Sequence, residues 1–226
     1  KDLVIPFDSL IYGRNSFYSH NESVFSVFKK RTEEAPDAIA LIEDKKATLY
    51  SELLDNSRII AGLFQELGIK KGDRIGIFMN RSVEMISTIL GAMSCGIIYV
   101  PLDPRMPTER INVMLEDANA KAIFTNSENL KKNIIDTPTI FINKDFFNTS
   151  SYFCFDELKI NPDDVAYIMF TSGTTGKPKG IEITHRGILK LVCNADYATL
   201  NENTVVLSLS SIAFDISTFE IWGGLL

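Results

Sequence analysis

The sequence predicts an α/β protein in which a mostly parallel sheet is covered by helices. Two observations predict it. Apolar segments of strand length alternate along the chain with longer segments of helical periodicity, and one strand–helix–strand run has the spacing of a βαβ unit. The composition agrees, since 45% of the 226 residues are hydrophobic and 23% are charged, as in globular domains.

The N-terminal part of the chain is expected to hold two helices and a strand. Residues 1–22 have mixed composition and are interpreted as an N-terminal arm or linker. Ser23 can cap a helix, which Ala35-Pro36-Asp37 would end. Ile39 to Ile42 predicts a strand, and Ser51 to Leu67 has the apolar spacing of an amphipathic helix that a glycine ends.

The βαβ unit follows. Arg74 to Met79 and Ile97 to Val100 are predicted strands, and Ser82 to Cys95 between them is a predicted helix. This spacing requires a parallel strand pair and a right-handed crossover. The uncharged run from Met85 to Leu102 is long enough to span a bilayer, but its hydroxyl groups, glycines and proline favour a soluble βαβ unit.

The alternation continues in the rest of the chain. Pro107 suits the first turn of a helix, and Thr184 can cap another. Residues 143–164 are predicted to be irregular. Four more segments are predicted to be strands: Ala122 to Thr125, Thr139 to Ile142, Val165 to Phe170 and Thr204 to Leu209.

Charge and cysteine content exclude several classes of protein. The net charge of −6 gives no general attraction to nucleic acid or to an anionic membrane, so neither is an expected partner. Three cysteines without a CxxC pair (Cys95, Cys154 and Cys193) exclude a disulfide framework, and with only two histidines no metal site is expected. A reducing, cytoplasmic location fits best.

One segment has the composition of a polyphosphate site. The ten residues from Thr171 to Gly180 follow a predicted strand and hold three glycines, four hydroxyl groups and two lysines. Glycines let backbone N–H groups converge on an anion, and hydroxyls and lysines add donors. The candidate binding residues are Thr171, Ser172, Gly173, Thr174, Thr175, Gly176, Lys177, Lys179 and Gly180.

This segment is not a P-loop. Only two residues separate Gly173 from Gly176, Pro178 follows the lysine, and Ile181 to Thr184 is expected to be extended rather than helical. A flexible Gly/Ser/Thr linker remains the alternative, although its position directly after a strand disfavours it.

The run YIMFTSGTTGKPKG, from Tyr167 to Gly180, closely resembles the signature of the adenylate-forming enzymes, which include acyl-CoA synthetases, luciferases and the adenylation domains of nonribosomal peptide synthetases. Three further segments resemble motifs of the peptide-synthetase branch: Leu49 to Leu53 (with Leu49 where Thr or Ser is usual), Leu90 to Arg110, and Phe214 to Trp222. The resemblance implies that residues 23–226 are the N-terminal part of an adenylation domain, truncated on the C-terminal side.

Asp215 is the main candidate for substrate binding. It follows an uncharged run and is expected near a strand end, where ligands bind in open α/β sheets. From the residues alone, its carboxylate could hold an ammonium group or cap a helix from Ser217 to Leu226. The resemblance favours the ammonium contact and places Ile216 and Phe219 in the side-chain pocket, with core packing as the alternative for both.

Three other polar residues are interpreted as structural. Pro101 and Pro104 indicate a rigid turn after a strand, so Tyr99 and Asp103 are assigned to that turn rather than to catalysis. His185 follows the glycine-rich segment at a predicted helix start and is not expected to act as a base.

The resemblance implies ATP-dependent activation of an amino acid as an aminoacyl adenylate, followed by transfer to the phosphopantetheine thiol of a carrier domain. It implies ATP and Mg²⁺ as cofactors, and neighbouring synthetase domains or a small accessory protein as further candidate partners.

The family's catalytic lysine and most of its magnesium and adenosine contacts lie beyond Leu226, so no catalytic residue is expected within the chain, which alone should be inactive. The chain begins with Lys1, not Met, and is expected to be a piece of a longer protein. A non-catalytic nucleotide-binding or scaffold piece and an acyl-CoA synthetase-like ligase remain alternatives.

Overall fold

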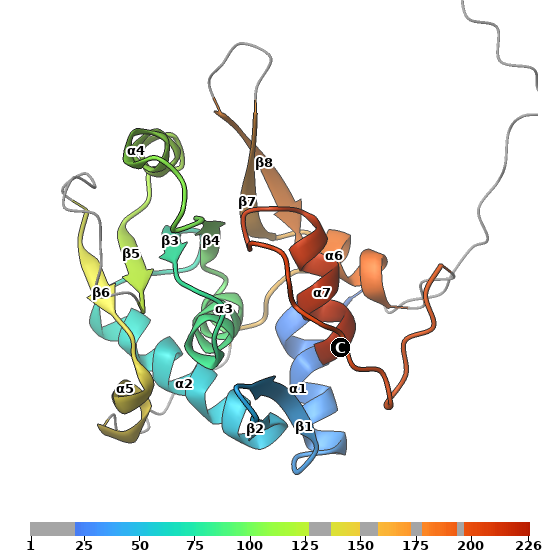
Figure 1. The fold of residues 1–226 in the computed structure, drawn as a ribbon. Coiled ribbons are helices and arrows are strands. Elements are labelled where there is room, and N and C mark those ends of the chain that lie inside the picture. Colours follow the sequence, from blue (N-terminus) through green and yellow to red (C-terminus); the bar gives the residue numbers. More distant parts are fainter. Residues whose placement is uncertain (1–20, 127–136, 150–157, 173–177, 194–196) are drawn as a thin grey trace, which may run out of the picture.

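The computed structural model describes residues 21–126, 137–149, 158–172, 178–193 and 197–226 (Figure 1). Within these residues, six strands form one sheet in the order β6-β5-β3-β4-β7-β8. In that order, the strands are Thr139–Phe141, Ala122–Thr125, Arg74–Phe78, Ile98–Pro101, Val165–Ser172 and Pro178–Thr184. All neighbours are parallel except β7 and β8, which are antiparallel. The predicted mostly parallel α/β fold is confirmed.

Helices cover both faces of this sheet. The described helices are α1 (Val24–Glu34), α2 (Tyr50–Glu66), α3 (Val83–Cys95), α4 (Thr108–Asp117), α5 (Lys144–Thr149), α6 (His185–Val192) and α7 (Ile216–Leu225). Strand residues alternate between two apolar clusters: Ile75 and Ile77 of β3 pack with α1, α2, α3, α6 and α7, whereas Phe78 packs with α4. This alternation follows from the two-residue period of a strand.

Side-chain caps fix the starts of three helices, each close to where the sequence predicts it. Ser23 and Ser26 form a reciprocal capping box at α1. Ser82 Oγ accepts a hydrogen bond from the Met85 amide at the start of α3, and Thr184 does the same for Gly187 at α6. The helix predicted from Pro107 also forms, with Pro107 at its N-cap.

The βαβ unit around α3 is confirmed, because β3 and β4 pair in parallel from Arg74 opposite Ile98 to Ile77 opposite Pro101. Gly96 ends α3 with a φ of 65°, a left-handed conformation that glycine adopts without strain. Over the part of the chain that the structure describes, no helix combines the length and apolar content needed to cross a bilayer.

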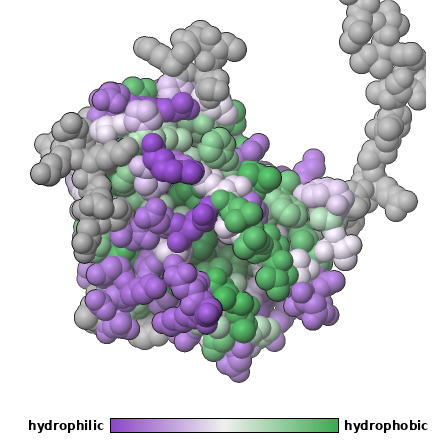
Figure 2. All heavy atoms as spheres, viewed as in Figure 1, coloured by the Kyte–Doolittle hydropathy of each residue, from purple (hydrophilic) through white to green (hydrophobic). Residues whose placement is uncertain are grey.

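The strand predicted from Thr204 to Leu209 is wrong. This segment pairs with no described strand, and three of its four apolar residues are exposed: Val205 by 87%, Leu207 by 70% and Leu209 by 65%. Alternating apolar residues predict a strand only where a neighbouring strand accepts the hydrogen bonds, and none of the described strands lies alongside. Figure 2 shows hydrophobic side chains gathered over α7 and the segment that leads into it.

Two local elements were not predicted. The region expected to be irregular contains the short helix α5. A two-stranded antiparallel sheet forms from β1 (Ile39–Glu43), which was predicted, and β2 (Lys46–Leu49), which was not. Asp44 and Lys45 turn the chain between them, both with positive φ, as in a tight hairpin turn.

The helices α2 and α3 approach closely at Gly91. A Cβ atom added there would lie 2.7 Å from Ile60 Cγ2 and 2.9 Å from the Ser57 carbonyl oxygen. We therefore expect Gly91→Ala to lower the free energy of unfolding by about 1–3 kcal/mol, measured by urea denaturation. The control is Gly187→Ala in α6, where the nearest atom lies 3.6 Å from the added Cβ. Equal stability of Gly91→Ala and wild type would contradict close helix packing at this position.

Candidate functional site at the carboxyl edge of the sheet

The carboxyl ends of four strands meet at one edge of the sheet. Strands β5, β3, β4 and β7 lie side by side and run parallel. Their last residues, among them Phe78, Pro101 and Ser172, therefore face the same edge. In open α/β sheets this is the edge at which ligands bind.

The glycine-rich segment joins β7, which ends at this edge, to β8, which runs back from it. Thr171 and Ser172 end β7, and β8 begins at Pro178. Ser172 lies opposite Pro178, and Thr171 lies opposite Lys179, so residues 173–177 connect the strands of an antiparallel hairpin (Figure 1). The expected extended conformation after the segment is confirmed, and Gly173, Thr174, Thr175, Gly176 and Lys177 lie outside the described residues.

Two predicted anion-binding side chains share one face of the hairpin. Thr171 and Lys179 are both exposed, and residues directly opposite each other on antiparallel strands project from the same face. A hydroxyl donor and an ammonium group therefore stand together next to the glycine-rich connection.

Gly180 has a packing role. It lies opposite Phe170, and a Cβ atom there would come within 2.9 Å of Ile168 Cγ2 and 3.3 Å of the Phe170 ring. The absence of a side chain lets the ring lie across β8. This packing accounts for a glycine at position 180 and does not require Gly180 to contact a ligand.

Asp215 stands at the start of α7 with its side chain exposed. Its Oδ1 accepts a hydrogen bond from the Ile216 amide at 2.8 Å, and its carbonyl oxygen accepts one from the Thr218 amide at 3.0 Å. Asp215 is thus the N-cap residue, as the helix interpretation expects. An exposed carboxylate at this position can also receive a cationic group, so the cap does not exclude the ammonium contact.

The two predicted pocket residues differ in environment. Ile216 is 57% exposed, so it does not belong to the core. Phe219 is half-buried, packs against the larger apolar cluster and lies 6.0 Å, between ring centroids, from Tyr197. Core packing therefore accounts for part of the Phe219 surface, whereas Ile216 remains available to a ligand.

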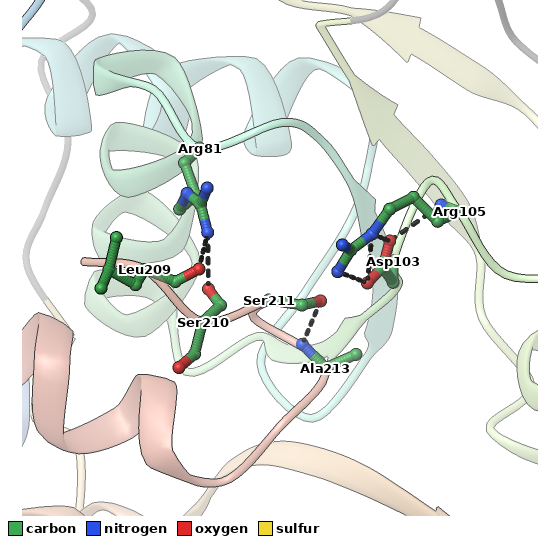
Figure 3. A network of polar contacts seen from close by, with 7 residues as sticks. All are labelled: Arg81, Asp103, Arg105, Leu209, Ser210, Ser211 and Ala213. Atoms are coloured by element: carbon green, nitrogen blue, oxygen red, sulfur yellow. Dashed lines mark hydrogen bonds and ion pairs between the residues drawn. The ribbon is translucent and has the colours of Figure 1, made fainter.

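Polar contacts attach the segment before α7 to the carboxyl edge (Figure 3). The guanidinium of Arg81, which follows β3, donates hydrogen bonds to the carbonyl oxygens of Leu209 and Ser210. Glu220 in α7 accepts from the amides of the same two residues, at 3.1 and 2.9 Å, and from the Ser210 hydroxyl at 2.7 Å.

Asp103 lies beside this segment. It is buried just after β4 and holds the Arg105 guanidinium with a shortest distance of 2.7 Å (Figure 3). The hydrogen bonds from Arg105 hold the pKa of this carboxyl at about 2, so it stays ionised. The structural interpretation of Asp103 agrees with these contacts.

Tyr167 of β7 fixes the first turn of α7. Its hydroxyl lies 2.7 Å from Thr218 Oγ1, and its ring centroid lies 5.2 Å from that of the buried Tyr99. Burial raises the pKa of both phenols, so both are neutral at physiological pH. These contacts place the start of α7 against the strand that leads to the glycine-rich segment.

His185 is enclosed by the protein and lies away from solvent. It is 1% exposed, and its Nδ1 accepts a hydrogen bond from the Val24 amide at 3.3 Å, which joins α6 to α1. Burial lowers its pKa to about 4. Within the described ranges, no group of three or more His, Cys, Asp or Glu side chains could hold a metal ion.

Sequence reasoning missed Arg81 and the role of Glu220. Arg81 lies 128 residues from Leu209 in the chain, so no local pattern connects them. Glu220 is part of a recognised motif, but its contacts with residues that precede its own helix depend on how the chain turns before α7.

Comparisons with known proteins identify the class. The family described as AMP-binding enzyme matches residues 28–226, and the chain therefore belongs to it. Gramicidin S synthase 2 of Brevibacillus brevis is 32% identical over 213 residues, which cover 92% of this chain and 5% of that protein. Malpibaldin synthetase of Mortierella alpina is also 32% identical over 213 residues, which cover 94% of this chain and 4% of that protein. The regions of these relatives that match this chain are adenylation domains of nonribosomal peptide synthetases.

Solved structures agree in fold. The N-terminal subdomain of NpsA from Klebsiella oxytoca, in complex with 3-hydroxyanthranilyl-AMSN, has a TM-score of 0.81 at 28% identity and covers 90% of this chain. An artificially fused NpsA-ThdA adenylation–PCP di-domain from the same organism has a TM-score of 0.83 at 27% identity. This chain spans 51% of the first structure and 42% of the second.

The buried His185 predicts a pH dependence of stability. Its pKa is about 4 in the folded chain against about 6.5 unfolded, so the unfolded chain binds the proton more readily. The contribution of the neutral, buried His185 to the free energy of unfolding is complete above about pH 6.5 and is lost as the pH falls towards 4. We expect the free energy of unfolding by urea to be about 2 kcal/mol lower at pH 5 than at pH 7. In His185→Asn, which keeps an acceptor for Val24, this difference should shrink. The same difference in both proteins would contradict the assignment to His185.

Proposed function

We propose that this chain is part of an ATP-dependent ligase that activates an α-amino acid as an aminoacyl adenylate. The observation that carries the proposal is the arrangement at the carboxyl edge. The hairpin with Thr171 and Lys179 follows the end of β7, and the first turn of α7, which the exposed Asp215 begins, contacts the same strand through Tyr167 and Thr218. The fold is that of the AMP-binding enzyme family.

The hairpin is proposed to hold the phosphates of ATP. Its donors are the Thr171 and Ser172 hydroxyls, the Lys177 and Lys179 ammonium groups, and the backbone amides of the glycine-rich connection. In a chain with a net charge of −6, a local pair of lysines is needed to attract a polyanion. The matched family supports a nucleotide ligand.

Asp215 is proposed to hold the substrate's ammonium group, with Ile216 and Phe219 next to its side chain. The first-turn position on α7 leaves the carboxylate exposed beside Tyr167 and Thr218, neither of which carries charge at neutral pH. A substrate bound beside these neutral groups would cover the carboxylate, and a charge pair that is shielded from water contributes more than one in open water.

The chemistry needs no nucleophilic side chain. The substrate's own carboxylate oxygen attacks the α-phosphorus of ATP, an oxygen–phosphorus bond forms, and the bond to the leaving pyrophosphate breaks. The protein's part is to align the two substrates and to neutralise charge, for which Mg²⁺ provides further cationic stabilisation.

The complete protein is proposed to pass the acyl group to the phosphopantetheine thiol of a carrier domain, in the cytoplasm. The NpsA-ThdA di-domain, which joins an adenylation domain to a PCP, supports a carrier partner. Since this chain spans about half of the NpsA N-terminal subdomain, we expect the 226-residue chain alone to be inactive.

An aryl acid is the second candidate substrate. The NpsA subdomain was solved with 3-hydroxyanthranilyl-AMSN and with 3-hydroxybenzoyl-AMSN. Asp215 favours the α-amino acid, because an aryl acid without an ammonium group would leave this carboxylate unpaired. A panel of amino acids, anthranilate and benzoate in ATP–pyrophosphate exchange by the full-length protein distinguishes the two.

The role of Asp215 is tested by two substitutions. In the full-length protein, Asp215→Ala and Asp215→Asn should both weaken amino-acid binding by about 2–5 kcal/mol, seen as a higher KM in pyrophosphate exchange, with little change in the KM for ATP. Asn is a good N-cap but carries no charge. If Asp215→Asn were nearly as active as wild type, the cap alone would explain the residue.

The role of the hairpin lysines is tested separately. Lys179→Ala or Lys177→Ala should weaken ATP binding by about 1.5–3 kcal/mol, because a charge-assisted contact is lost, while thermal stability stays the same. Lys190→Ala, on the exposed surface of α6, removes the same charge elsewhere and serves as the control. An unchanged KM for ATP in both hairpin variants would reject the phosphate-binding role.

A further inference from the structure

Residues Leu209 and Ser210 are held on all their backbone polar groups by two charged side chains. Arg81 donates to both carbonyl oxygens, while Glu220 accepts from both amides and from the Ser210 hydroxyl. Leu209 and Ser210 lie in a segment that pairs with no described strand, yet their backbone polar groups are hydrogen-bonded as completely as those of a residue pair between two strands. Charge-assisted bonds of this kind are stronger than those between neutral groups.

The Arg81 side of this clamp is rigid. Its neighbours Asn80 and Ser82 are both bound by Asn126 at the end of β5: the Asn126 side chain accepts from the Asn80 amide at 3.0 Å and donates to Ser82 Oγ at 2.9 Å. Ser82 is also the N-cap of α3. The loop that carries Arg81 is therefore fixed to two strands and one helix.

The Glu220 side belongs to the helix that Asp215 begins. Residues 209–220 thus form a closed loop, in which the second turn of α7 binds the chain that leads into its first turn. Within this loop the Phe214 amide donates to the Ser211 carbonyl at 3.0 Å, and the Ala213 amide donates to the Ser211 hydroxyl at 3.3 Å. Little freedom remains for Asp215 to move relative to the sheet edge.

We propose that Arg81 and Glu220 are positioning residues, which hold residues 209–210 so that Asp215 meets the substrate in the correct place. The proposal rests on the proposed function of Asp215 and adds the two residues that fix its location. Neither residue is assigned a contact with the substrate. Displacement of a binding group by about 1 Å is enough to lower activity strongly.

The test uses the full-length protein and the amino acid that gives the fastest ATP–pyrophosphate exchange in the panel. Arg81→Ala and Glu220→Ala should each raise the KM for this amino acid about tenfold or more, with the KM for ATP changed less than about twofold. Arg81→Lys keeps a cationic donor and Glu220→Gln keeps an acceptor oxygen, so each should recover part of the loss. Combined in one protein, Arg81→Ala and Glu220→Ala should raise the KM less than the product of their separate effects, because both act on the same dipeptide.

Deuterium uptake provides a readout that does not depend on activity. The amides of Leu209 and Ser210 bond to Glu220, so peptides covering residues 209–215 should exchange faster in both alanine variants than in wild type. Lys121→Ala is the control, since Lys121 pairs with Asp73 at the opposite edge of the sheet, at 2.9 Å, and its loss should leave uptake and both KM values unchanged.

Four results would overturn the proposal. Unchanged uptake at 209–215 would show that the clamp does not hold the segment. Faster uptake with an unchanged amino-acid KM would show that the clamp does not position Asp215, and an equal rise in both KM values would indicate general destabilisation. No exchange by the wild-type protein with any panel member would overturn the proposed function and the positioning role with it, and the uptake data would separate that result from failure of the clamp alone.

Discussion

The parallel pairing of β5, β3, β4 and β7 is the constraint on which the rest of the site depends. It brings the carboxyl ends of four strands to one edge, and each end carries a polar group that performs a task there. Asn126 after β5 fixes the loop of Arg81 after β3, while Asp103 after β4 binds the Arg105 guanidinium. If one of these strands were reversed, its polar group would lie at the opposite edge.

The antiparallel strand β8 uses the same edge differently. Because β7 and β8 pair up to Ser172 and Pro178, the glycine-rich connection is held at both ends by a ladder of hydrogen bonds and does not open a helix. This distinguishes it from a P-loop, in which a helix N-terminus faces the phosphates. In the proposed function, the opposed pair of Thr171 and Lys179 takes the place of the helix as the source of donors.

Local patterns predicted most of the fold and part of the site. Capping residues, the βαβ spacing and the glycine-rich segment have signals within a few residues, and the helices and strands they predicted are present. The prediction of a strand from Thr204 to Leu209 is wrong because alternating apolar residues describe a single strand and do not show whether a partner strand lies beside it. Arg81 gave no signal, since its partners lie 128 and 129 residues away and come close only when the sheet and α7 are assembled.

A crystal structure of the full-length protein with an amino acid and a non-hydrolysable ATP analogue tests the central claim, that one edge of the sheet binds both substrates. The account predicts phosphate oxygens within hydrogen-bond distance of the Thr171 and Lys179 side chains, and the ammonium group within hydrogen-bond distance of the Asp215 carboxylate. Binding of either ligand away from the carboxyl ends of β3, β4 and β7 would contradict it.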